Sequence, residues 1–522
     1  MPRTWWAWAY VRDPVMAKPP EQIGSFALVL HTHLPWLAHH GAWPVGEEWL
    51  HQAWATSYLP VLDLLTRLGA EGRTDLLTLA VTPVLAAQLD DPYCRRGFHH
   101  WLGSWQLRAE ELAASPEPAL REVAGREFRA SQDALAQAEG CWSAGLSPVL
   151  RPLVDAGVVE LLGGPATHAF APLLPDPVNA FALQAGLDDA TARIGRRPAG
   201  IWAPECGYRP GLEHGYAHAG VRHFLVDGPN LLSAGRSTAD GWTAGDSDVV
   251  AFGRDLEVTY RVWSPRKGYP GGRWYLDFHD LHHDSGFRPS RVTTATTPPS
   301  RKAPYDSAAA RTAVEQDAQD FVAVVRRRLL DLRSERGGRP ALTVAAFDTE
   351  LFGHWWHEGP LWLERVLRLL PHAGVRVTTL ASAAASGHVA GRVDLGPGSW
   401  GSGKDWRVWS GAAVADLAAE NERVAQHLSA LLARTPVAAR DPVGDQLART
   451  GLLALASDWA FMVSKDSAAG YARARHHGHH DDFRALAAVL ESGDRAAAEQ
   501  LAAALQRRDG PLPWLDARLF QG

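Results

Sequence analysis

The 522-residue sequence predicts an α/β protein built on an incomplete TIM-like (β/α)7 barrel with added helices. Short apolar segments alternate with stretches of helical periodicity, which is the pattern of parallel strands joined by crossover helices. Polar and acidic residues gather where several of these apolar segments end, as they do at the active-site rim of parallel barrels. From 411 to 508, by contrast, the pattern is almost entirely helical.

The predicted strands are apolar segments that end in polar residues. We place them at 25–35, 74–83, 158–175, 197–208, 221–230, 341–350 and 374–386, where 158–175 continues into a loop and 374–386 into a helix. Helical periodicity predicts helices at 47–68 and 313–333. It also predicts a helical insertion at about 84–154, which Ser115 and Pro116 interrupt.

These segments predict the division of the chain into regions. Residues 231–310 are rich in Gly, Pro, Ser, Thr and Trp and are expected to form long functional loops with short strands. We expect an N-terminal extension at 1–23 and a barrel at 24–395 that includes the insertion and these loops. A helical C-terminal domain at 396–522 would complete the site.

Composition narrows the class of function. The net charge of −6 and the lack of a basic block give no indication of nucleic acid or an anionic membrane as partner. There is no run of 18 apolar residues that could span a membrane. Three unevenly spaced cysteines, and an N-terminus whose apolar residues are interrupted by Arg12 and Asp13, predict a cytoplasmic protein. The 22 tryptophans suit a protein that stacks sugar rings on indoles.

Three histidines are predicted to lie at strand ends. His31 and His33 are two residues apart in HTHLPW, so both point to the same face of a strand. Imidazoles at this spacing can hold a metal ion, donate hydrogen bonds to sugar hydroxyls, or form a satisfied structural pair. His168, in PATHAF, alone would be a packed histidine, but with the other two it adds an imidazole at another strand end.

Two acidic segments offer the groups that cleave glycosidic bonds. Glu205, in GIWAPECGY, lies near Trp202 and follows Pro204, which turns the chain outward; it is a candidate nucleophile or base, or a solvated loop carboxylate. Asp348 and Glu350, in FDTELFGHWW, lie beside indoles whose low polarity would raise a carboxyl pKa. One ionised and one protonated carboxyl group cleave a glycosidic bond, but the residues alone leave open whether Asp348 or Glu350 is the acid.

Five segments, in order, resemble the motif regions of glycoside hydrolase family 57: HTHLP, GGPATHAFAPLL, IWAPECGY, FDTELFGHWWHEGPLWL and ASDWAFMVSKDSAAGYARARHHGHHDDF. Within that family the chain most resembles the 1,4-α-glucan branching enzymes. The similarity runs from about Gly24 to the last residues, where LPWLD (512–516) resembles the C-terminal signature of the family. The resemblance implies the (β/α)7 barrel, with Glu205 as nucleophile and Asp348 as general acid/base.

The resemblance also implies a glucan-binding surface and no cofactor or metal. The predicted set consists of matched positions and of residues beside them: His31, His33, His168, Trp202, Tyr269, His354, Trp355, Trp356, Trp400, Trp406, Trp409, Asp458 and Trp459. Tyr269, in VWSPRKGYPG, would lie on a flexible loop that covers the site and favours transfer over hydrolysis. The histidine run in RARHHGHHDDF is interpreted as loop packing rather than metal capture. Pro289 and Ser290 stand where family members usually carry an aromatic ring, which leaves acceptor length and transfer efficiency open.

The mechanism implied is a retaining double displacement on an α-1,4-glucan. Glu205 attacks the anomeric carbon while Asp348 protonates the leaving oxygen, and Asp348 then deprotonates the 6-hydroxyl of an acceptor glucan to form an α-1,6 branch. Such a mechanism requires the two carboxyl groups to lie about 5–5.5 Å apart.

Other activities remain open at this level. Within the family they are α-amylase-type hydrolysis, 4-α-glucanotransfer and α-1,6 debranching. A metal-dependent polysaccharide deacetylase could use HTH, His168 and an aspartate on a similar barrel, and a glucan-binding protein without activity is a third reading. The Tyr269 loop and the helical C-terminal block favour branching. The physiological glucan and the oligomeric state stay open.

Overall fold

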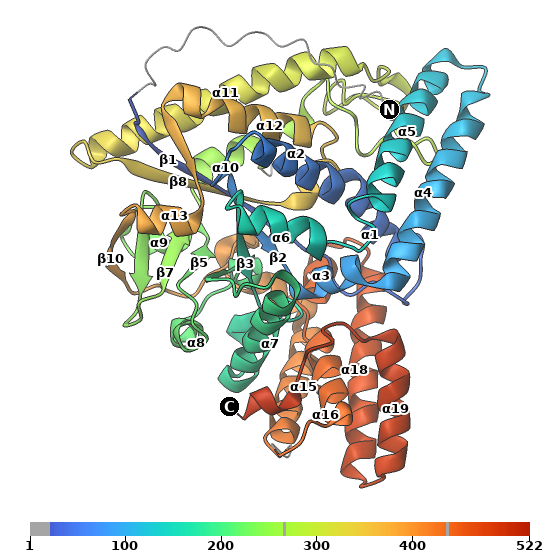
Figure 1. Cartoon of the computed structure of the whole chain (residues 1–522), viewed down its shortest axis with the longest axis vertical. Helices are drawn as coiled ribbons and strands as arrows, with labels where there is room; N and C mark the ends of the chain where they lie inside the picture. Colours follow the sequence, from blue (N-terminus) through green and yellow to red (C-terminus); the bar gives the residue numbers. More distant parts are fainter. Residues whose placement is uncertain (1–20, 265–267, 435–437, 522) are drawn as a thin grey trace.

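A curled parallel sheet lies at the centre of the computed structural model, which describes residues 21–264, 268–434 and 438–521 (Figure 1). Most of the predicted N-terminal extension lies outside these residues. In the described part, seven strands run parallel in the order β8–β1–β2–β3–β4–β5–β7. They are β1 (Gly24–Thr32), β2 (Leu77–Val81), β3 (Val159–Gly163), β4 (Gly200–Ile201), β5 (His223–Val226), β7 (Val250–Gly253) and β8 (Ala341–Asp348).

The two ends of this parallel run meet, so the sheet curls into an incomplete barrel. The backbone N–H of Asp255, just after β7, donates to the carbonyl oxygen of Val344 in β8 at 2.8 Å. Alternate residues of the strands fill the interior in one buried cluster, among them Ala27, Val29, Ala80, Leu162, Leu225, Phe252, Leu342 and Val344. The intervening residues face the surrounding helices, which explains why the strands are apolar on both faces. The predicted fold class is confirmed.

Three further strands lie beside the barrel. β6 (Gly241–Ala244) is antiparallel to β7 and pairs on its other edge with β10 (Val389–Val393), whereas β9 (Val375–Thr378) pairs with the start of β1. The seventh barrel strand is therefore β7, inside the predicted loop region 231–310, and the strand predicted at 374–386 is β9, outside the main order. A four-residue strand surrounded by Gly, Ser and Asp shows too little apolar pattern to be recognised in the sequence.

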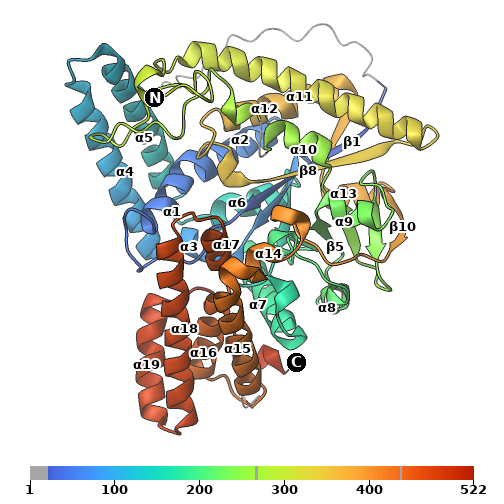
Figure 2. The same cartoon turned by 180° about the vertical axis from the view of Figure 1, so that it is seen from behind.

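Helices cover the outside of the barrel (Figures 1 and 2). The predicted helix 47–68 is observed as α1 and α2, joined by a π-helical turn at Trp54–Tyr58. The predicted insertion contains α3 to α6, of which α4 and α5 form a long antiparallel pair that stands at one side of Figure 1. The bounds of α1 to α9 are α1 (Glu47–Ala53), α2 (Leu59–Ala70), α3 (Pro83–Asp90), α4 (Pro92–Ala113), α5 (Pro118–Glu139), α6 (Ser147–Asp155), α7 (Asp176–Ile194), α8 (Leu212–His218) and α9 (Gly228–Ser233).

The second half of the chain supplies more covering helices and the C-terminal helical region. The bounds are α10 (Leu256–Val262), α11 (Ser307–Glu335), α12 (Gly359–Leu369), α13 (Leu380–Ala385), α14 (Arg407–Ser410), α15 (Ala415–Leu432), α16 (Pro442–Ala454), α17 (Asp458–Ser464), α18 (Ala469–Glu491) and α19 (Arg495–Arg508). Helices α15, α16, α18 and α19 pack together and against α7 through a shared apolar cluster (Figure 1). None of the helices in the described residues combines the length and apolar character that crossing a bilayer requires.

The C-terminal region also touches the carboxyl-end rim of the barrel. Ala169, in the loop after β3, forms an isolated antiparallel bridge with Ala456, between α16 and α17. This contact brings the start of α17 next to His168. The rim is therefore completed by residues that are far away in the sequence.

Candidate active site

Glu205 lies on a tight turn at the end of β4. Its φ angle of 62° is in the left-handed region that non-glycine residues rarely adopt, and its side chain is only 7% exposed. Trp400 Nε1 donates to Oε2 at 2.7 Å, and Ser457 Oγ donates to Oε1 at 3.2 Å. Burial raises the pKa of Glu205 to about 8; the charges of Asp458 and Asp348 add to this shift, and the two hydrogen bonds oppose it.

Asp348 is the last residue of β8 and lies directly beside His31 in the strand register. The residue is half-buried at the rim. Burial raises the pKa of Asp348 to about 6, against the opposing influence of His33 and Arg254. The charge of Asp348 also raises the pKa of Glu205, so the two carboxyl groups titrate as a coupled pair. Their expected separation of about 5–5.5 Å stays a prediction.

Glu350 is held inside the wall of the site. It is 3% exposed, and its Oε1 accepts hydrogen bonds from the hydroxyl of Tyr58 at 2.5 Å and from the backbone N–H of His33 at 3.3 Å. Burial and the charge of Asp348 raise the pKa of Glu350 to about 8. Of the two acids in this segment, Asp348 is therefore the more exposed one, at the rim of the barrel.

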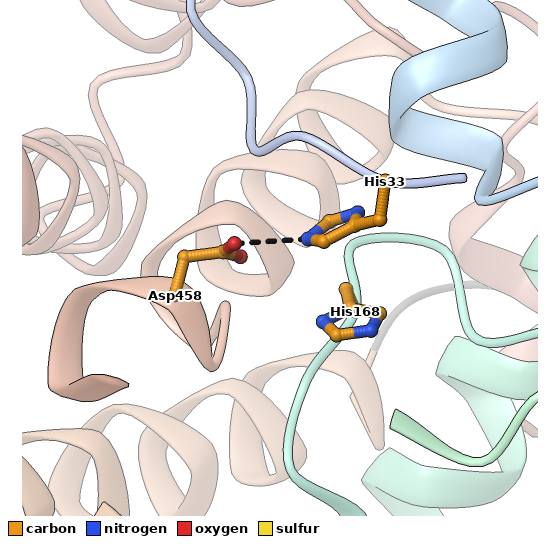
Figure 3. A group of neighbouring side chains, drawn as sticks. All are labelled: His33, His168 and Asp458. Atoms are coloured by element: carbon orange, nitrogen blue, oxygen red, sulfur yellow. Dashed lines mark hydrogen bonds and ion pairs between the residues drawn. The ribbon is translucent and has the colours of Figure 1, made fainter. Parts of the chain in front are cut away.

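Two of the predicted histidines, His33 and His168, come together with Asp458 (Figure 3), and the ring of His31 stacks near both of theirs. His33 Nε2 lies 2.9 Å from Asp458 Oδ1, and its Nδ1 lies 2.9 Å from Thr82 Oγ1. The rings of His33 and His168 stack with their centroids 3.8 Å apart and their planes 21° apart. The lone pairs of imidazole nitrogens lie in the ring plane, so two nearly parallel rings cannot both direct a nitrogen at one ion about 2.0–2.1 Å away. The cluster is arranged for hydrogen bonding.

Aromatic side chains form the walls around the carboxyl groups. Trp202 stacks on His31 with ring centroids 4.3 Å apart, and Trp400 meets Trp202 edge-on at 4.9 Å. Trp355 is partly exposed and pairs with Trp263 at 6.1 Å and an interplanar angle of 25°. Trp263 is 51% exposed, so this pair presents an open indole face. Trp263 lies in the segment VWSPRKGYPG but is not among the residues predicted to bind glucan.

Several predicted aromatic residues are buried. Trp356, Trp409 and Trp459 are each at most 2% exposed, and Trp409 stacks on Phe170. Tyr269 packs against Trp356 and Trp362, and its hydroxyl donates to Asp320 of α11. These four rings pack against other side chains in this structure, and their predicted contacts with a glucan stay a prediction. Residues 265–267 of the predicted Tyr269 loop lie outside the described residues.

Two of the predicted residues lie at the margin of the site. His354 packs edge-on against Phe278, and burial lowers the pKa of its imidazole to about 4. Trp406 is half-buried and lines an open surface hollow of about 350 Å³ together with Asp405 and Arg407. Like Trp263, Ser457 and Tyr58 are absent from the predicted set, although their hydroxyl groups donate to the carboxylates of Glu205 and Glu350.

A parallel barrel that presents coupled carboxyl groups, histidines and indoles at the carboxyl ends of its strands defines a glycoside-processing enzyme. Residues 27–384 match the family model described as glycosyl hydrolase family 57, and residues 417–520 match the model described as 1,4-alpha-glucan branching enzyme, C-terminal. The chain belongs to glycosyl hydrolase family 57.

Individual relatives cover nearly the whole chain. A probable 1,4-alpha-glucan branching enzyme of Mycobacterium tuberculosis is 55% identical over 519 residues, which cover 95% of this chain and 98% of that protein. The crystal structure of a family 57 branching enzyme from Thermococcus kodakaraensis is similar with a TM-score of 0.88 at 32% identity, covering 95% of this chain and 96% of that one. The alpha-amylase AmyC from Thermotoga maritima is similar with a TM-score of 0.83 at 26% identity, covering 96% and 99%.

Proposed function

We propose that this chain is a 1,4-α-glucan branching enzyme. The observation that supports the proposal is the likeness to branching enzymes over both the barrel and the C-terminal helical region. The substrate would be an α-glucan, which serves as donor and as acceptor.

Glu205 is the nucleophile of this proposal. Trp400 and Ser457 each hold one of its oxygens, so the carboxylate cannot rotate freely before it attacks the anomeric carbon. Attack displaces the reducing-side part of the glucan and leaves a β-glycosyl ester on Glu205. The left-handed backbone at this position aims the side chain from the turn after β4.

Asp348 is the general acid/base. In the first step it gives its proton to the departing glycosidic oxygen, and in the second it takes the proton from the 6-hydroxyl of the acceptor glucan. The acceptor oxygen then attacks the anomeric carbon, and an α-1,6 linkage forms as the ester breaks. Water competes in this step, so the indoles that surround the carboxyl groups matter for excluding it.

The proposed glucan-contacting surface combines the histidine cluster with the accessible indoles. His33 and Asp458, which are partly exposed, supply polar groups beside the carboxylates, and the buried rings of His31 and His168 stack near the ring of His33. Trp355 with Trp263, Trp400, and the half-buried Trp406 supply flat faces, and Trp400 is the one that hydrogen-bonds Glu205. The ring of Trp202 packs against the rings of His31 and Trp400.

Product analysis distinguishes branching from its alternatives. We expect amylose incubated with the protein to gain α-1,6 linkages, which a debranching enzyme then converts into new reducing ends, with few reducing ends before debranching. Transfer conserves reducing ends, whereas hydrolysis creates one for each bond cleaved. An early rise in reducing ends without branches would indicate an amylase. Altered chain lengths with neither new reducing ends nor new α-1,6 branches would indicate a 4-α-glucanotransferase. The amylase result and the glucanotransferase result each contradict branching.

The pH profile of kcat/KM is expected to be bell-shaped. The pair carries one proton between the pKa values of about 6 for Asp348 and about 8 for Glu205. These values place that proton mainly on Glu205 in the free enzyme, so the reactive form is the minor tautomer in which Asp348 carries the proton and Glu205 is ionised. Activity should fall below about pH 6, where a second proton is bound, and above about pH 8, where the last proton is lost. Initial branching rates at low substrate concentration measure this. Aliquots returned to pH 7 control for denaturation, and a profile flat from pH 5 to 9 would contradict the assignment.

A further inference from the structure

A chain of hydrogen bonds connects Glu205 to two of the histidines through Ser457. Ser457 Oγ lies 3.2 Å from Glu205 Oε1 and 2.9 Å from His168 Nδ1. His168 Nε2 in turn lies 3.0 Å from His31 Nε2. Ser457 and Glu205 are 252 positions apart in the sequence, and both side-chain donors observed on this carboxylate, Trp400 and Ser457, come from the part of the chain after residue 396.

The hydrogen bonds that link these four residues have a defined direction when Glu205 is ionised. A carboxylate only accepts, so Ser457 donates its one proton to Glu205 and must accept from His168 Nδ1–H. The Nε2 of neutral His168 is then a lone pair that accepts from His31 Nε2–H. His31 Nδ1 is the remaining lone pair, and it is buried without a hydrogen-bond partner among the described residues. Burial lowers the pKa of His31 and of His168, so both rings are neutral as this chain requires.

The backbone around Ser457 fixes its position. Its N–H donates to the carbonyl oxygen of His168 at 3.1 Å, and the neighbouring residues Ala169 and Ala456 form the antiparallel bridge. His168 has a φ angle of 62°, which turns its side chain so that ring and carbonyl both face Ser457. Two backbone contacts and one side-chain contact thus hold the hydroxyl against Glu205. Ser457 itself is 3% exposed, so bulk water does not replace it.

We propose that Ser457 is a positioning residue for Glu205, and that His168 and His31 determine the direction in which its hydroxyl points. This rests on the proposed role of Glu205 as nucleophile. With His168 Nδ1–H behind it, the hydroxyl can only donate forward, which keeps Oε1 hydrogen-bonded and favours the ionised carboxylate. Trp400 holds the other oxygen, so Oε1 and Oε2 are set by two separate parts of the chain.

The other groups that act on Glu205 set the background for a pH test. Asp348 on β8 and Asp458 at the start of α17 both raise its pKa, and the neutral histidines face it through Ser457. The thiol of the next residue, Cys206, is buried, and burial raises its pKa well above the ordinary value, so it stays uncharged. Loss of the Ser457 donor should therefore raise the pKa of Glu205 further, because the ionised form loses a hydrogen bond.

The test compares Ser457→Ala with Ser457→Thr. We expect Ser457→Ala to move the basic limb of the kcat/KM profile up by about one pH unit and to lower the maximum about tenfold, because one unit in pKa is a tenfold change in the ionised fraction. KM for amylose should change less than about twofold, since the hydroxyl binds enzyme rather than glucan. Ser457→Thr keeps the hydroxyl and should restore the limb. The proposal is overturned if the basic limb of the kcat/KM profile of Ser457→Ala coincides with that of the unmodified protein. It is also overturned if Ser457→Thr does not return the limb to that position.

Variants of His168 test the direction of these hydrogen bonds. His168→Asn offers an amide N–H near the position of Nδ1–H and tolerates a positive φ angle, so the basic limb should stay close to that of the unmodified protein. His168→Ala removes the N–H and should move the limb in the same direction as Ser457→Ala. If the basic limb of the kcat/KM profile lies at the same pH in His168→Asn and His168→Ala, His168 does not set the direction of the Ser457 hydroxyl.

Failure of this proposal can be separated from failure of the proposed function. If Glu205→Gln is inactive while Ser457→Ala leaves the limb unmoved, Glu205 remains the nucleophile and only the positioning role is wrong. If Glu205→Gln is active, the assignment of the nucleophile is wrong, and the positioning role loses its basis as well.

Discussion

Glu205→Gln is expected to abolish branching, with a loss of at least about 10⁴-fold, because an amide cannot form the glycosyl ester on which both steps depend. Glucan binding should persist, since the variant keeps the size of the side chain and an oxygen that accepts from Trp400 or Ser457. The melting temperature at pH 8 or above should not fall. Burial raises the pKa of Glu205 from its ordinary value of 4.5 to about 8, so native stability falls as the pH rises from about 4.5 to about 8, and the full cost of the ionised carboxylate remains above that pH. A neutral amide removes this cost.

Glu213→Gln is the matched control for this variant. Glu213 is another buried glutamate, in the segment just after Glu205, and it accepts from the hydroxyl of Tyr208 and the N–H of Gly211, away from the site. Its activity should stay within about twofold, as expected for a residue without contact to reacting groups. Residual branching above about 1% in Glu205→Gln would contradict the nucleophile assignment, because loss of a covalent catalyst costs far more.

A positive signal comes from Glu205→Gly with azide. Glycine tolerates the φ angle of 62° at this position and leaves room for a small anion. Azide should then attack the anomeric carbon directly and yield a glycosyl azide of inverted configuration, with Asp348 still protonating the leaving oxygen. Nuclear magnetic resonance of the product reports the anomeric configuration. A retained configuration would show that another group had formed the covalent intermediate.

The sequence predicted the barrel strands at 25–35, 74–83, 158–175, 197–208, 221–230 and 341–350, and it did not predict β7. β1 and β8 span nine and eight residues and are mostly apolar because both faces are buried, so each is recognisable without its neighbours. β4 has two residues and β7 has four, and only pairing with the adjacent strands makes them part of the barrel. Their membership depends on contacts that the local sequence does not encode.

The site shows the same division between local and long-range information. Asp348 was visible because a carboxylate at the end of an apolar strand is unusual, and Glu205 because it follows Trp202 and Pro204. Ser457 had no such signal, since a serine before a helix is common and its importance comes from contacts with Glu205 and His168.

The tryptophans illustrate a second limit of the sequence. Trp355 and Trp356 are adjacent and chemically identical, yet one is partly exposed and pairs with Trp263, while the other is 1% exposed in the core. A turn after β8 sends successive side chains in opposite directions, and no property of the residues themselves tells which one faces the opening. Predicting that indoles surround the site was possible from composition, but assigning each indole required the packing.

Asp348→Asn is expected to lower branching of amylose by about 10³-fold, within the range that general acid–base catalysis contributes. The effect should depend on the leaving group. A glucan oxygen needs the proton from Asp348, whereas fluoride in a maltosyl fluoride donor leaves without it, so the first step should remain fast with that donor. The ester on Glu205 should then accumulate, because no base activates the acceptor. Mass spectrometry of the intact protein detects this adduct.

Azide gives Asp348→Asn a signature opposite to that of Glu205→Gly. The anion needs no general base, so it should attack the accumulated ester and release a glycosyl azide of retained configuration. Retention here and inversion in Glu205→Gly would assign the two carboxyl groups independently. Retention requires that the ester form first, so a variant without rescue and without adduct would contradict the role of Asp348.

Glu350→Gln decides between the two acids that the sequence left open. Glu350 binds Tyr58 and the backbone of His33 inside the wall, and a glutamine oxygen can accept the same two hydrogen bonds. Its loss of activity should therefore stay below about tenfold, as for a group that acts through neighbours, and azide should not increase the rate. If Glu350→Gln instead accumulates the ester and is rescued by azide, while Asp348→Asn is not, the two residues exchange roles. The difference in exposure favours Asp348, because a general acid must reach the glycosidic oxygen and Glu350 is enclosed.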